Sequence, residues 1–100
     1  MKIEYTDVAI DDMARLREFI AEHNPLAADK IARRLVAGIK QLSRQPRLGH
    51  PVSHAPDPDQ LRDLVPGSYI VRYTPLRQSV LILRIWHHRE DWSNDDITEG

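Results

Sequence analysis

Polar and apolar residues alternate at the amino end of the chain and then change to a helical spacing. Residues 2–5 alternate at period two, which predicts a short strand with Ile3 and Tyr5 on one face. Thr6 or Asp7 can then cap a helix, because either side chain accepts hydrogen bonds from the exposed amides of a first helical turn. The pattern therefore predicts a strand that leads directly into a helix.

The first predicted helix spans residues 7–22. Its apolar residues recur at helical spacing and form one stripe: Ala9, Met13, Leu16 and Ile20. The acidic residues fall between them, so we expect their side chains to point to solvent. Asp11 and Asp12 also lie near the amino end, where negative charge suits the helix dipole.

A second helix is predicted over residues 25–44. Pro25 fits its first position, where the missing N–H costs nothing, and Asn24 is a suitable cap. A second apolar stripe follows: Ala28, Ile31, Leu35, Ile39 and Leu42. The two helices are therefore expected to form an antiparallel hairpin.

The second half of the chain predicts a loop followed by strands. Prolines interrupt every period in residues 45–60, which we interpret as a loop. Strands are expected at 61–65, 68–74 and 80–86, and the last is apolar at both parities, as in a strand covered on both faces. The order β-α-α-β-β-β predicts an α+β fold, with the helical hairpin on one face of a mainly antiparallel sheet. We expect one domain over residues 1–92 and a flexible acidic tail over 93–100.

Charge is unevenly distributed along the 100 residues, although the net charge is only -1. Residues 25–44 carry five basic side chains and one acid, a balance of +4, and residues 61–89 carry the same balance. The last eleven residues hold five acids and no base. Cysteine is absent, which excludes disulfides, zinc-thiolate sites and thiol catalysis. No segment approaches the ~20 apolar residues of a membrane span and the start lacks a signal peptide, so we expect a cytoplasmic protein.

Four ordered motifs resemble the RelE/ParE toxin family of type II toxin-antitoxin systems, and the ParE branch in particular. They are the loop Pro46, Leu48, Gly49, Pro51, then residues 61–64, residues 67–73, and the ending Trp-His-His-Arg-Glu-Asp-Trp at 86–92. The resemblance implies a toxin that an antitoxin neutralises by wrapping a disordered segment around it. ParE-like members poison DNA gyrase, whereas RelE-like members cut mRNA on the ribosome.

The residues favour gyrase inhibition over mRNA cleavage. A metal-independent endonuclease needs cations and a proton-transfer group near the end of the last strand, and here Arg72, Arg84, His87 and His88 would be the catalytic candidates. However, no tyrosine follows Tyr73, and the acidic ending would repel phosphates. We therefore expect a gyrase inhibitor with no catalytic residues. The alternatives are an mRNA endonuclease and a degenerate toxin that serves only as an antitoxin-binding module.

We expect two protein partners: a cognate ParD-like antitoxin, which forms a hetero-oligomer with the toxin, and DNA gyrase. We expect no direct nucleic-acid binding by the toxin, no cofactor and no metal. The candidate partner-binding residues are Arg33, Arg34, Arg84, Arg89 and Trp92. For Arg84, within an apolar strand, the first interpretation is a structural ion pair and the second is partner binding. Trp92 is equally well interpreted as closing the core or as an interface residue. Adjacent residues in a strand point to opposite faces, which argues against His87 and His88 sharing one metal ion.

Overall fold

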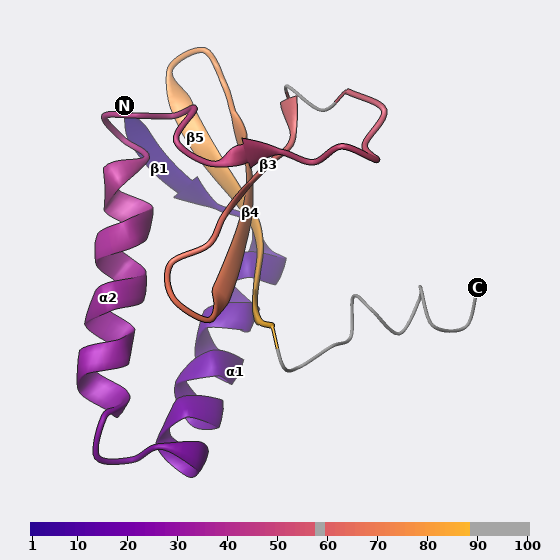
Figure 1. Cartoon of the computed structure of the whole chain (residues 1–100). Coiled ribbons are helices and arrows are strands. Elements are labelled where there is room, and N and C mark those ends of the chain that lie inside the picture. Colours follow the sequence, from indigo (N-terminus) through magenta and orange to yellow (C-terminus); the bar gives the residue numbers. More distant parts are fainter. Residues whose placement is uncertain (58–59, 89–100) are drawn as a thin grey trace.

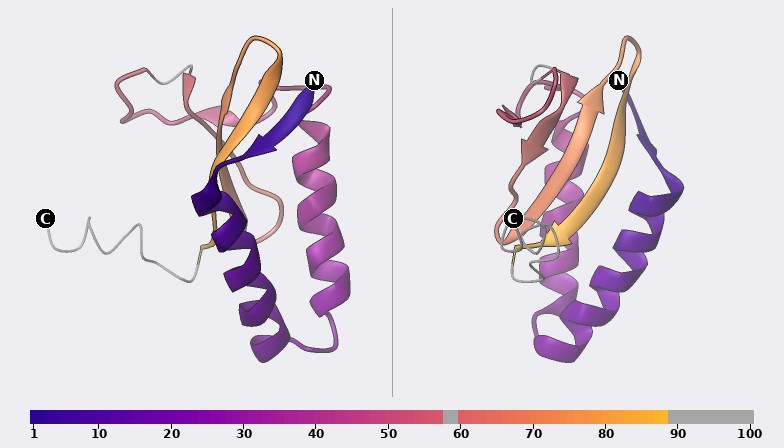
Figure 2. Two further views of the ribbon diagram at one scale, coloured as in Figure 1. Left: turned by 180° about the vertical axis from the view of Figure 1, so that it is seen from behind. Right: turned by 90° about the vertical axis from the view of Figure 1, so that its right-hand side faces the viewer.

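The computed structural model describes residues 1–57 and 60–88. Its elements run β1 (Lys2–Tyr5), α1 (Asp7–His23), α2 (Ala28–Gln41), β2 (His50–Pro51), β3 (Arg62–Leu64), β4 (Tyr69–Pro75) and β5 (Ser79–His87). Two helices pack on one side of a five-stranded sheet (Figures 1 and 2), so the predicted α+β class is confirmed. The expectations for Arg89, Trp92 and the tail fall outside the described residues.

The helical hairpin forms as predicted, but its connection differs. Thr6 is the cap of α1, and its hydroxyl oxygen accepts from the Ala9 amide at 3.0 Å. Asn24 does not cap α2, whose N-cap residue is Ala27; it ends α1 instead, where its own N–H donates to the Ile20 carbonyl. Pro25 lies in the turn that follows, and α2 begins at Ala28 without a side-chain cap. The prediction of Asn24 and Pro25 as the start of the second helix was therefore wrong.

The sheet has the strand order β1-β5-β4-β3-β2, in which β1 pairs with β5 in parallel and all other pairs are antiparallel. The sequence pattern missed β2, because two residues that include a proline carry no periodic signal. Pro51 is tolerated there because β2 is an edge strand, where a missing ladder hydrogen bond costs little. The proline loop thus adds a fifth strand to the predicted order.

A bulge in β5 explains why that strand is apolar at both parities. Arg72 pairs with Arg84, but Tyr73 pairs with Ile82, so Leu83 is an extra residue. Val80 and Ile82 before the bulge and Ile85 after it are all fully buried in one core. Leu81 and Leu83 are only half-buried. The face of β5 turned away from the helices is thus partly covered, since Trp86 on that face is only 4% exposed. The change in which parity faces the core comes from the bulge.

The core lies between the helices and the sheet. Leu16 and Ile20 of α1, and the buried residues of α2 and the turn after it, meet the inward residues of β4 and β5. The buried residues from the second helical stripe and the sheet include Leu35, Ile39, Leu42, Val71, Tyr73, Val80, Ile82 and Ile85. Both predicted apolar stripes are confirmed. The turn that joins β3 and β4 lies beside α2 (Figure 1), where a Cβ added at Gly38 would be 3.0 Å from Pro66 Cβ.

Candidate partner-binding site

The exposed edge of β5 is completed by side chains of α1. Strand β1 ends at Tyr5, so β5 loses its parallel neighbour beyond Ile82. Asp12 accepts from the Ile85 amide at 2.9 Å, and Arg15 donates to the Ile85 carbonyl at 3.2 Å. These bonds satisfy the Ile85 N–H and C=O groups, which would otherwise have no hydrogen-bond partner at the edge of the sheet.

Asp12 is also the centre of a charge network, contrary to the expectation that all acids of this helix face solvent. It is 2% exposed, and it accepts from Arg84 Nε at 2.9 Å and from Arg15 Nη1 at 2.7 Å. Burial alone would raise the pKa of Asp12, but the hydrogen bonds from Arg84, the Ile85 amide and Arg15 hold the pKa below its ordinary value. Arg84 is therefore a structural ion-pair partner, the first of the two interpretations made for it.

Arg72 is held in a second ion pair on the sheet face turned away from the helices. Its Nε and Nη2 each donate to Asp63 at 2.9 Å, and its guanidinium lies 5.2 Å from the centre of the Trp86 ring. The hydrogen bond with Asp63 raises the pKa of Arg72. Arg72 and Arg84 are direct cross-strand neighbours. His87 follows at the opposite parity, on the helix side, so the described structure does not bring both arginines together with His87.

The two histidines also differ from the expected arrangement. His88 lies in a turn after β5 ends, so its ring stacks on that of His87 with 4.9 Å between ring centres instead of pointing to the opposite face. The His88 backbone N–H donates to the Ser68 carbonyl at 2.9 Å. His87 itself packs edge-on to Tyr69 at 4.9 Å and against Phe19 at 5.2 Å. Three elements thus converge on His87.

The proline loop is anchored by residues from three of the quoted motifs, for which the sequence predicted no individual role. The Gly49 amide donates to the buried Tyr73 hydroxyl at 2.8 Å, and the buried Arg62 guanidinium donates to the Gly49 carbonyl. A Cβ at Gly49 would lie 2.7 Å from the Asp63 carbonyl oxygen, closer than real Cβ contacts. Burial raises the pKa of Tyr73, so its hydroxyl stays protonated. Glycine is therefore required where the loop meets the sheet.

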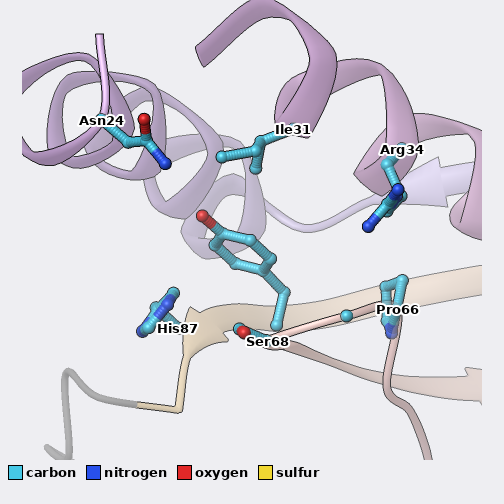
Figure 3. Close-up of a pocket in the computed structure, with 8 residues that line it drawn as sticks. Asn24, Ile31, Arg34, Pro66, Ser68 and His87 are labelled. Carbon is cyan, nitrogen blue, oxygen red and sulfur yellow. The ribbon is translucent and has the colours of Figure 1, made fainter. Parts of the chain in front are cut away.

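A cleft opens where the end of the hairpin faces the β3–β4 turn. We call it the hairpin cleft. It consists of two adjoining cavities of about 300 and 310 Å³ that share five lining residues: Asn24, Ile31, Ser68, Tyr69 and His87. One cavity adds Arg34, Pro66 and Gly67, and the other adds Phe19, Ile20, His23 and His88. Figure 3 shows Arg34 reaching from α2 toward the turn that carries Pro66 and Ser68.

The two adjacent arginines of α2 occupy different surroundings. Arg33 is exposed and forms an i,i+4 ion pair with Asp29, which raises the pKa of Arg33. Together with Ala32, Val36, Ala37 and Lys40 it lines a separate cavity of about 310 Å³ on the outer side of the helix. Arg34 instead lines the hairpin cleft. The helix therefore presents its basic residues to two distinct surfaces.

Other kinds of site find little support in the part of the chain that is described. Across residues 1–57 and 60–88, no three histidine or acidic side chains are grouped so that they could hold a metal ion. Neither α1 nor α2 is long and apolar enough to cross a membrane. His50 and His54 are exposed in the proline loop.

Comparison with known proteins gives the family. The family model described as "ParE toxin of type II toxin-antitoxin system, parDE" matches residues 3–92. This chain belongs to the ParE toxin family. A search among curated proteins gives no match.

A solved structure of the chromosomal ParDE toxin-antitoxin system from P. aeruginosa has the same fold. It superposes with a TM-score of 0.72 at 20% sequence identity, over 87% of this chain and 95% of that one. The ParE family match includes the proline loop and the ending that carried the resemblance in the sequence. The protein is thus the toxin of a type II toxin-antitoxin system.

Proposed function

We propose that this ParE toxin acts in the cytoplasm by binding proteins: it inhibits DNA gyrase, and a cognate ParD-like antitoxin neutralises it in a hetero-oligomer. The main support is the commitment of Arg72 and Arg84 to internal ion pairs with Asp63 and Asp12. Metal-independent RNA cleavage needs a cation at the phosphate and a proton acceptor at the attacking hydroxyl in one place. Here the two arginines and His87 belong to opposite faces of the sheet.

The gyrase proposal is tested with purified toxin, gyrase and relaxed plasmid. We expect loss of supercoiling and accumulation of cleaved DNA. The same preparation is added to translating ribosomes, and mRNA ends are mapped by primer extension. Codon-phased breaks in mRNA together with unimpaired supercoiling would refute the proposal and support the endonuclease alternative.

The antitoxin proposal draws on the charge of α2. Arg33 and Lys40 border a cavity whose remaining lining residues are Ala32, Val36 and Ala37. Apolar lining residues with a basic border suit an acidic amphipathic segment, because charge speeds encounter while apolar burial supplies affinity. We assign Arg33 and Arg34 to partner binding, as well as Arg89 and Trp92, which lie outside the described residues. Arg84, the fifth candidate from the sequence, is instead held by Asp12 in an internal ion pair.

A further inference from the structure

The hairpin cleft contains a cation that has no counter-charge within residues 1–57 and 60–88. Arg34 makes neither an ion pair nor a side-chain hydrogen bond there, whereas its neighbour Arg33 pairs with Asp29. The Arg34 stem lies over the turn, since a Cβ added at Gly67 would be 4.0 Å from Arg34 Cδ. Gly67 itself has a φ of +67°, a conformation that favours glycine and keeps the turn close to α2. The turn and α2 thus place the Arg34 guanidinium at the cleft.

The remaining walls of the cleft combine apolar surface with polar groups, which include the rings of His23, His87 and His88. Ile31, Pro66 and the ring of Tyr69 form the apolar part, and Asn24 and Ser68 supply an amide and a hydroxyl. Each cavity of about 300 Å³ is at the lower end of the ~300–1,000 Å³ typical of ligand pockets. The space therefore suits one or two side chains of a bound segment better than a large cofactor.

We propose that the hairpin cleft is a carboxylate-binding subsite that receives one aspartate or glutamate side chain of the antitoxin. This inference rests on the proposed function, because it assumes an antitoxin partner. A guanidinium matches a carboxylate with two parallel hydrogen bonds, and the apolar walls can cover the methylene groups of the acidic residue. A polynucleotide would require a row of cations to neutralise successive phosphates. The cleft has one arginine, so a single carboxylate is the better fit.

The chain provides a matched control for this subsite. Arg34→Gln and Arg17→Gln remove the same charge from an exposed helical arginine, but Arg17 is on α1 and lines neither the hairpin cleft nor the cavity beside Arg33. Both side chains belong to exposed residues, so both variants should fold, which the amide spectrum in NMR can verify. The binding probe is the protein encoded by the gene adjacent to the toxin gene, titrated by calorimetry against each full-length toxin.

We expect Arg34→Gln to weaken antitoxin binding roughly 10- to 100-fold, which corresponds to the loss of charge-assisted hydrogen bonds. Arg17→Gln should change the dissociation constant less than about 3-fold, because Arg17 borders neither proposed binding surface and an exposed charge at a distance is screened by solvent. Each acidic residue of the antitoxin is then changed to its amide. One of these changes should lose its effect when combined with Arg34→Gln, and this coupling identifies the bound carboxylate.

The alternative outcomes separate this inference from the proposed function. If wild-type toxin binds the antitoxin and the two glutamine variants weaken binding equally, or not at all, the subsite is refuted while the antitoxin partnership stands. The subsite is also refuted if Arg34→Gln alone weakens antitoxin binding but no acidic residue of the antitoxin shows coupling with it. If wild-type toxin does not bind the antitoxin, the proposed partnership fails, and the carboxylate subsite fails with it.

Discussion

Asp12 offers the sharpest test of how this fold is held together. Its two oxygens accept four hydrogen bonds: two from Arg84, one from Arg15 and one from the Ile85 amide, at 2.7 to 3.3 Å. Asp12→Asn keeps the shape of the side chain but replaces one accepting oxygen with an NH₂ group. That group would face guanidinium or amide hydrogens, so about two of the four bonds are lost and the charge is removed.

The expected loss of stability follows from these contacts. Breaking a fully buried ion pair costs roughly 3–5 kcal/mol, but the side chains of Arg84 and Arg15 are 37% and 39% exposed and can be partly hydrated. Two charge-assisted hydrogen bonds, discounted for this screening, give about 2–3 kcal/mol. For a chain of this size that corresponds to a fall in Tm of roughly 10–20 °C.

The assay is urea unfolding followed by tryptophan fluorescence, with thermal unfolding by circular dichroism as a second measurement. The control is Asp11→Asn, which changes an exposed acid one residue away. We expect this control to stay within about 0.5 kcal/mol of wild type. If Asp12→Asn matched the control, the reasoning that Asp12 secures the β5 edge would be refuted.

Three further predictions concern pH, the proline loop and charge steering. The folded-state pKa of Asp12 is below its ordinary value of 3.8. The stability that its carboxylate contributes is therefore present above pH 3.8 and is lost as pH falls through the folded pKa. In acid unfolding curves, the difference in stability between wild type and Asp12→Asn should shrink over the same range. Gly49→Ala should lower the free energy of unfolding in urea by roughly 1–3 kcal/mol, because the added Cβ would press on the Asp63 carbonyl. Tyr73→Phe should lower it by about 1–2 kcal/mol, because the Gly49 amide loses its acceptor. Wild-type stability in both variants would contradict the anchoring of the loop. Reversing Arg33 and Arg34 together to glutamate should slow antitoxin association and flatten its salt dependence in stopped-flow measurements, while unchanged rates at low ionic strength would rule out steering through α2.

Local pattern alone was sufficient for the main elements. The two helical stripes, the alternation in residues 2–5 and the apolar run of the last strand each depend on neighbours within a few residues. Their positions in the structure agree with those expected to within a few residues. The charge segregation that marked α2 as a partner surface is likewise a property of the sequence.

Register was decided only by the tertiary structure. The bulge at Leu83 changes which residues of β5 face the helices, and it depends on how β5 pairs with β4. Strand β2 exists only because β3 provides a partner for His50 and Pro51. No periodicity within either segment carries this information, because pairing is set between residues distant in the sequence.

The environment of each charged residue was also decided by tertiary contacts. Asp12 resembles its exposed neighbour Asp11 in the sequence, yet it meets Arg84 from a strand 72 residues later. Arg33 and Arg34 are equivalent in composition, but the helix directs one to its outer side and the other into the hairpin cleft. The sequence determined which elements form and where charge gathers. Packing decided which charges are internal supports and which remain available to a partner, because burial and ion pairing require groups that only the folded chain brings together.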